Sequence, residues 1–180
     1  MSIPLLPKPA KLVVGLFMKE KGLIHDLTNA LIEKFGSIDL VSAWFPFDYT
    51  TYYEPEMGTP LFRRMLAFKT LVEQRSLTEK KFITNDLELK FSINQKRRVN
   101  IDPGYLVHEH FVLATGKNYA HRIYLDKGIY ADLTLIYTKG AFQKLPWTYP
   151  DYADKRMLAY LHRVRDKYIE DIKKIDSANP

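Results

Sequence analysis

Runs and stripes of apolar residues divide the first half of the chain into strands and helices. Residues 11–18 are almost continuously apolar, which is typical of a central strand that is buried on both faces. Apolar residues then recur at helical spacing over residues 23–35, and Gly36 marks the expected end of that helix. The same patterns predict four further elements: strands over residues 40–45, 63–72 and 98–102, and a helix over residues 76–91.

This order of elements is the β-α-β-β-α-β order of a ferredoxin-like unit, so we predict an α+β fold with a ferredoxin-like core. In the second half, residues 106–114 are ambiguous between helix and strand, and we favour a helix. An antiparallel hairpin is predicted over residues 122–137, and a long C-terminal helix over residues 153–176. We expect one domain over residues 1–180, with residues 1–10 as an extended N-terminal segment.

The hairpin has a predicted register. Its loop, residues 126–128, places Gly128 where a left-handed residue is needed. Four pairs follow from this loop: Arg122 with Asp132, Ile123 with Ala131, Tyr124 with Tyr130, and Leu125 with Ile129. One face of the hairpin would then be apolar, and the other would carry Arg122, Tyr124, Tyr130, Asp132 and Thr134.

The strand over residues 98–102 carries the first candidate site. Because side chains alternate along a strand, Val99 and Ile101 would point one way and the polar residues Arg98, Asn100 and Asp102 the other. The following residues, 103–104, are Pro-Gly and predict a type II turn. If this strand lies beside the hairpin, Asp102 and Asp132 should lie on the same side of one sheet, within reach of Arg122.

Such a polar face would suit a phosphate group or a hydrated Mg²⁺. The predicted catalytic residues are Asp102, Asp132 and His121, of which Asp102 and Asp132 would also be the metal ligands. The predicted ligand-binding residues are Arg98, Asn100, Tyr105, Arg122, Tyr124 and Tyr130. The competing interpretation is a cross-strand ion pair on a solvated sheet face.

Composition excludes some chemistry. The chain has no cysteine, which rules out disulfides, thiolate metal sites and cysteine nucleophiles. Its N-terminus does not have the pattern of a signal peptide, and residues 12–18 are too short an apolar run to span a bilayer, so we expect a cytoplasmic protein without membrane association. The formal net charge is +6, most of it in the second half, which suits either an anionic partner or a solvated basic surface.

Three functions agree with these features. The first is binding of a phosphorylated small molecule or nucleotide. If the protein is an enzyme, it would convert this ligand at the same site. The second is an RNA-binding module built on the ferredoxin-like core and the basic residues 96–98. The third is assembly, for example a homodimer, through the apolar stripe of the C-terminal helix. Aromatic loops that contain acids, at residues 44–49, 52–56 and 146–151, favour a pocket wall.

Several longer motifs resemble one known family. They lie at residues 45–58, 98–106, 121–131 and 145–152. Together they are similar to a prokaryotic family catalogued as domain of unknown function 4416. The resemblance implies a cytoplasmic protein of this length, and some members are labelled GTP-binding. Residues 114–117, Ala-Thr-Gly-Lys, match only the end of a P-loop, because Phe111 stands where the first glycine belongs.

Overall fold

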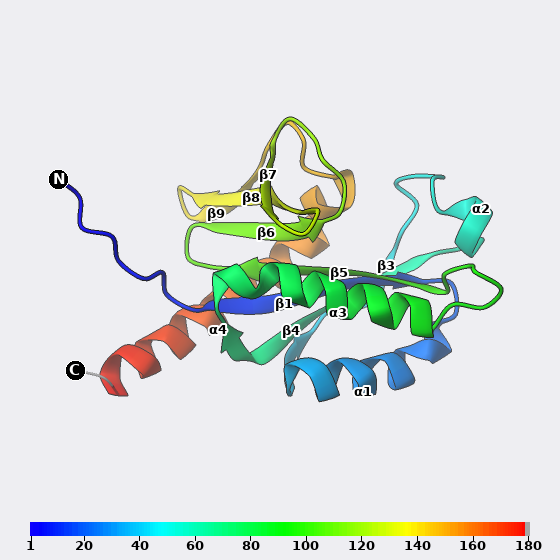
Figure 1. Ribbon diagram of the computed structural model, residues 1–180, viewed down its shortest axis with the longest axis horizontal. Helices are drawn as coiled ribbons and strands as arrows, with labels where there is room; N and C mark the ends of the chain where they lie inside the picture. Colours follow the sequence, from blue (N-terminus) through cyan, green and yellow to red (C-terminus); the bar gives the residue numbers. More distant parts are fainter. Residues whose placement is uncertain (179–180) are drawn as a thin grey trace.

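The structure is a computed structural model that describes residues 1–178, so the last two residues of the predicted 1–180 domain lie outside it (Figure 1). The helices are α1 (Ile24–Phe35), α2 (Glu54–Met57), α3 (Leu77–Lys90) and α4 (Lys155–Ala178). The strands of the first half are β1 (Ala10–Met18), β2 (Ile38–Val41), β3 (Phe45–Pro46), β4 (Phe62–Val72) and β5 (Val99–Leu106). Those of the second half are β6 (His110–Thr115), β7 (Arg122–Asp126), β8 (Ile129–Thr138) and β9 (Ala141–Lys144).

The described strands form one antiparallel sheet. Seven of them lie in the order β2-β4-β1-β5-β6-β8-β7, while β3 pairs with β4 and β9 pairs with β8. The predicted α+β class is therefore confirmed. None of the helices within residues 1–178 is both long enough and apolar enough to cross a membrane.

Helices cover both faces of the sheet, and the alternation along β1 explains why its whole length is apolar. Leu12, Val14 and Leu16 pack with residues of α1 and α3 in one buried cluster. Val13 packs with residues of α4 in a second cluster on the opposite face. Figure 1 shows α1 and α3 in front of the central strands and α4 behind them. The helix α4 buries most of its predicted apolar stripe, and Ile175 at its end is partly exposed.

An ion pair inside the protein fixes α4 to the sheet. The side chain of Lys11 on β1 is completely buried, and its Nζ donates to Asp171 of α4 at 2.6 Å and to Asp39 of β2. Burial alone would raise the pKa of Asp171, but its hydrogen bonds from Lys11 and Lys167 lower that pKa below its ordinary value. The carboxylate therefore stabilises the attachment of α4.

The predicted Pro103-Gly104 turn is wrong, because β5 continues through both residues. Pro103 pairs with Val14, and Gly104 pairs with Val13 on one side and Leu113 on the other. The glycine is explained by close approach of β6, since a Cβ at residue 104 would lie 2.4 Å from the carbonyl oxygen of Val112.

The predicted helix over residues 106–114 is also wrong. The chain turns back after Leu106, where the N–H of Val107 donates to the carbonyl oxygen of His110, and it then forms β6. Four successive residues, 111–114, are buried because β6 lies between β5 and β8 and is covered on both faces. A short apolar run of this kind does not distinguish a buried strand from a buried helix.

The remaining differences are local. The hairpin register is confirmed for Arg122 with Asp132, Ile123 with Ala131 and Tyr124 with Tyr130. Its last predicted pair is wrong, because an irregularity after Tyr124 pairs Asp126 rather than Leu125 with Ile129. The strand predicted over residues 40–45 is divided between β2 and β3, and the sequence did not predict β9.

Candidate functional site

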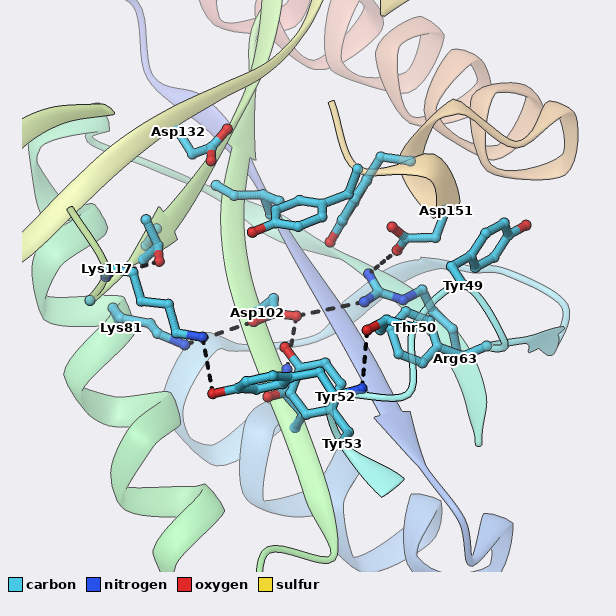
Figure 2. Close-up of a pocket in the computed structure, with 18 of the residues that line it drawn as sticks. Tyr49, Thr50, Tyr52, Tyr53, Arg63, Lys81, Asp102, Lys117, Asp132 and Asp151 are labelled. Atoms are coloured by element: carbon cyan, nitrogen blue, oxygen red, sulfur yellow. Dashed lines mark hydrogen bonds and ion pairs between the residues drawn. The ribbon is translucent and has the colours of Figure 1, made fainter. Parts of the chain in front are cut away.

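A cavity of about 620 Å³ lies where β5 and β6 separate (Figure 2). The two strands pair over only three residues each, from Leu106 with Phe111 to Gly104 with Leu113. Beyond these pairs, Asn100 and Asp102 of β5 line one side of the cavity, and residues 113–117 line another. Its volume is in the range of small-molecule sites.

Side chains of α3 replace the missing strand beside β5. Glu88 Oε1 accepts the backbone N–H of Ile101 at 2.6 Å, and Lys81 Nζ donates to the carbonyl oxygen of the same residue at 3.1 Å. Both backbone groups of Ile101 therefore point away from β1, toward α3. Pro103, two residues farther along, has the same orientation, so its missing N–H removes no bond to β1.

Aromatic loops form the outer wall, as the sequence predicted. The lining rings are Phe47, Tyr49, Tyr52, Tyr53, Tyr149 and Tyr152. Phe47 stacks on the buried ring of Phe17 at 4.4 Å between ring centroids, which fixes the base of this wall. Burial raises the pKa of Tyr53 to about 12, so its hydroxyl is a neutral hydrogen-bonding group at neutral pH.

The cavity has nine charged lining residues: the basic residues Arg63, Lys81, Arg97, Lys117 and Arg122, and the acidic residues Glu88, Asp102, Asp132 and Asp151. Opposite charges therefore almost balance. What separates these residues is how many of their hydrogen-bonding groups are already paired within the protein.

Arg122 holds loops together with one hydrogen bond from each of its three guanidinium nitrogens. Its Nε donates to Asp132 at 2.9 Å, its Nη1 to the carbonyl oxygen of Lys117 at 2.9 Å, and its Nη2 to the hydroxyl of Tyr149 at 3.1 Å. Asp132 is buried and also lies 3.3 Å from His121 Nε2. This arrangement attaches the loop after β6 to the loop that carries Tyr149.

Arg97 is engaged in a similar way at the other end of the cavity. Its guanidinium donates twice to Glu56 and once each to Glu88 and Asn100. Because Asn100 accepts through Oδ1, its Nδ2 is directed at Asp102 Oδ2, 2.8 Å away. Arg97 thus orients the amide that holds Asp102.

Arg63 is the exception among the arginines. It is only 4% exposed, yet its Nε and Nη1 have no hydrogen-bond partner among the described residues. The guanidinium carbon lies 5.3, 4.7 and 4.9 Å from the ring centroids of Phe17, Phe47 and Tyr152. Cation–π contacts and an ion pair between Nη1 and Asp151 Oδ2, 3.1 Å apart, therefore hold the charge in place, while Nε stays unpaired.

Asp102 lies between two cations at the centre of the cavity (Figure 2). Arg63 Nη2 is 3.7 Å from Asp102 Oδ2, and Lys81 Nζ is 3.9 Å from Asp102 Oδ1. Both separations are too long for hydrogen bonds. The donors of Arg63 and Lys81 and the acceptor Asp102 Oδ1 therefore line the cavity, and neither cation donates a hydrogen bond to Asp102.

Two further carboxyls of the lining are buried. Burial raises the pKa of Asp151 above its ordinary value, although Arg63 Nη1 lies 3.1 Å from its Oδ2 and acts in the opposite direction. Burial also raises the pKa of Glu88, against the effect of Lys81. For Arg63, burial alone would lower the pKa, but electrostatic interactions with Tyr152, Asp151 and Asp102 raise it above its ordinary value. Perturbed groups of this kind gather at functional sites.

The structure brings together part of the site predicted from sequence. Asp102, Asn100, Arg122 and Asp132 line the same cavity. Arg98 instead pairs with Glu20 at 2.6 Å, because its residue precedes β5 and is not held to the alternation of that strand.

The other predicted residues lie away from the cavity. His121 stacks on Trp147 at 4.8 Å between centroids and faces Asp132. Tyr124 is exposed on the edge strand β7 and contacts Tyr130. The ring of Tyr105 packs against that of His110, with 6.0 Å between the ring centroids. The tyrosines of the cavity come from the loops instead.

Sequence reasoning missed Arg63, Lys81, Glu88, Lys117 and Asp151. Lys81 and Glu88 had a readable signal, since they occupy the buried face of α3 with Leu77 and Thr84 at helical spacing. Phe82 of the same helix, although apolar, is 40% exposed. Arg63 had a weaker signal, as a charge in a largely apolar strand.

Comparison with known proteins gives a family. The model of a domain of unknown function, DUF4416, matches residues 8–168, so the chain belongs to this family. No curated protein and no solved structure matches the chain.

A metal site is not evident from the protein ligands. Within residues 1–178, there is no group of three or more His, Asp or Glu side chains arranged to hold a metal ion. Mg²⁺ needs as few as one or two carboxylates when phosphate oxygens complete its shell, so binding of Mg²⁺ by Asp102 or Asp132 stays a prediction.

Proposed function

We propose that the cavity between β5 and β6 binds a phosphorylated small molecule or a nucleotide, with the phosphate held by Arg63 and Lys81. The main support for this proposal is the buried guanidinium of Arg63. Its Nε has no hydrogen-bond partner among the described residues, and its Nη1, although 3.1 Å from Asp151 Oδ2, makes no well-formed hydrogen bond there. A buried donor without a partner costs about 1–3 kcal/mol, and more for a charged group. Binding of an oxyanion by this guanidinium would offset that cost.

Lys81 and Lys117 support the same assignment. Lys81 Nζ makes one hydrogen bond within the described chain, to Ile101, which leaves two N–H donors. Lys117 lies at the mouth, where its Nζ is 3.3 Å from the hydroxyl of Tyr52 and 4.5 Å from the centroid of that ring. An anion entering the cavity would meet Lys117 first and Arg63 last.

The aromatic mouth suits the remainder of such a ligand. Tyr52 and Tyr149 line the cavity and are 64% and 51% exposed, so each offers ring surface on which a base or a sugar would pack. The chain lacks a P-loop, so a nucleotide would be recognised through these side chains rather than through a glycine-rich loop.

A thermal-shift screen tests this function. The panel contains nucleotides, sugar phosphates and phenyl phosphate, each with and without Mg²⁺. A ligand at a hundred times its dissociation constant stabilises the folded state by about 2.7 kcal/mol, which is a measurable shift. We expect at least one phosphorylated compound to raise the melting temperature of the wild type.

The same screen on Arg63→Met should show no shift, because methionine retains much of the apolar packing but donates no hydrogen bond. Lys69→Met is the matched control, since Lys69 is exposed on the same strand. Equal shifts in Arg63→Met and the wild type, or no shift with any phosphorylated compound, would contradict the proposal.

We also propose that β1, α1, β2, β4, α3 and β5 form a ferredoxin-like core. Their order along the chain and the strand order β2-β4-β1-β5 support this assignment.

The RNA-binding alternative receives less support, because α4 packs over part of the sheet face that lies opposite α1 and α3. The buried stripe of α4 likewise leaves little apolar surface for a second copy. RNA binding, homodimer formation and the cytoplasmic location stay predictions.

A further inference from the structure

We infer that Asp102 makes the cavity selective for an oxyanion that carries a proton, which means the monoanion of a phosphate monoester rather than a sulfate ester or a phosphodiester. This inference rests on the proposed function, because it assigns the chemical class of ligand for that same cavity. It follows from the presence of a carboxylate between the two cations that would bind the anion.

Asp102 is held in position by a hydrogen bond to one of its two carboxylate oxygens. Its Oδ2 accepts from Asn100 Nδ2 at 2.8 Å, and Asn100 is in turn fixed by Arg97. Asp102 Oδ1 is its oxygen nearer to Lys81 Nζ, at 3.9 Å, and no side chain within residues 1–178 donates a hydrogen bond to it. The carboxylate is therefore held through Oδ2, and Oδ1 is left free to accept a hydrogen bond from a ligand.

An anion bound in the cavity would meet this carboxylate. An oxyanion that accepts hydrogen bonds from both Arg63 and Lys81 must lie against Asp102, because both cations flank that carboxylate. Two fully ionised groups would then face each other with no proton between them, which is unfavourable at such close range. An anion with one O–H avoids this conflict, because it donates to Asp102 while its other oxygens accept from Arg63 and Lys81.

The candidate anions differ in whether they carry a proton. Phosphate monoesters lose their second proton with a pKa of about 6, so the monoanion predominates below that pH and still makes up about a tenth of the ester at pH 7. Sulfate esters and phosphodiesters have no such proton. The donor–acceptor–donor order of Arg63, Asp102 and Lys81 therefore matches a terminal phosphate, whether it belongs to a sugar or to a nucleoside.

Two matched probes test the inference by isothermal titration in EDTA. At about pH 5, phenyl phosphate is mostly a monoanion and has the same charge as phenyl sulfate, so the two differ chiefly in one O–H. We expect the wild type to bind phenyl phosphate roughly ten- to a hundredfold more tightly, the factor for one buried acceptor left without a donor. Above a pH of about 6, its affinity should fall by about tenfold per pH unit, because the proton must be taken up.

Asp102→Asn should reduce the difference between the two esters to within about threefold, because the amide can donate to an ionised oxygen. Asp86→Asn removes an exposed carboxylate from α3 and should keep the wild-type preference. Equal binding of both esters by the wild type, or binding of phenyl phosphate only when Mg²⁺ is supplied, would overturn the inference and leave the proposed function standing. Absence of phenyl phosphate binding, together with no thermal shift from any phosphorylated compound, would overturn both.

Discussion

Glu88 accepts the backbone N–H of Ile101 at 2.6 Å, at the point where β5 has lost β6 as its neighbour. A helix side chain thus satisfies a strand edge that would otherwise be unpaired inside the protein. Because α3 performs this task, the sheet can separate locally and enclose a cavity without leaving this backbone group unpaired.

Removal of that carboxylate should destabilise the protein. Glu88→Ala leaves the N–H of Ile101 and one donor of Arg97 without their acceptor, so we expect a loss of about 2–4 kcal/mol in the free energy of unfolding. Glu88→Gln should lose less, because its amide oxygen still accepts. Urea unfolding measures the loss, and hydrogen exchange at Ile101 locates it. A loss no larger than that of Glu79→Ala, an exposed change on the same helix, would contradict the account.

The position at which the sheet separates depends on the close approach of two strands. In Gly104→Ala the added Cβ meets the carbonyl oxygen of Val112 at 2.4 Å, so β5 and β6 must move apart. We expect a loss of about 1–3 kcal/mol in the free energy of unfolding, as for other overpacked sites. Gly116→Ala, whose Cβ meets nothing within 4 Å, should change stability by less than about 0.5 kcal/mol. Similar losses in the two variants would show that the close approach is unimportant.

Asp151 should make stability depend on pH. Its pKa in the folded protein is raised by burial above the ordinary value of 3.8, so the folded state binds more protons than the unfolded state just above that pH. The contribution of this residue to stability therefore falls as the pH rises from about 4 through the raised pKa.

Asp151→Asn should remove this dependence. The difference in free energy of unfolding between Asp151→Asn and the wild type should shift in favour of the variant as the pH rises. Urea unfolding at a series of pH values measures it, with Asp86→Asn as the exposed control. A constant difference across the series would mean that the pKa of Asp151 is not raised.

The two arginines Arg122 and Arg98 should respond differently to the same change. Arg122→Lys cannot keep three donors directed at Asp132, Lys117 and Tyr149, so we expect a loss of about 2–4 kcal/mol and faster hydrogen exchange in the loop after β6. Arg98→Lys alters a partly exposed pair with Glu20, for which about 0–1 kcal/mol is expected. If the two losses in urea unfolding are equal, Arg122 does not hold the loops together.

The sequence predicted most of the elements because their apolar periodicity is strong. The helices α1 and α4 and the hairpin of β7 and β8 were recognised because stripes and turn residues are local signals. The errors around residues 103–114 have one physical cause, which is that tertiary contacts decide these segments. Gly104 reflects the approach of Val112 rather than a turn, and residues 111–114 are apolar because neighbours cover both faces of β6.

Only part of the candidate site was predicted, because tertiary contacts also decide which side chains meet there. Asp102 was found because its strand alternates between polar and apolar residues. Arg63 was not found, because β4 is far from β5 in sequence and only the sheet order brings the two strands close together. Lys81 was not found either, although it lies on the buried face of α3, the helix that precedes β5 in the chain. The sequence also gives no indication of which arginines are already paired, and this distinction separates Arg63 from Arg122.

The most direct test of the central claim is a crystal structure of the wild type with phenyl phosphate. We expect phosphate density in the cavity, within hydrogen-bond distance of Arg63 and Lys81, with one oxygen facing Asp102. A phosphate bound instead at the surface pair of Arg98 and Glu20, with the cavity between β5 and β6 empty, would contradict it.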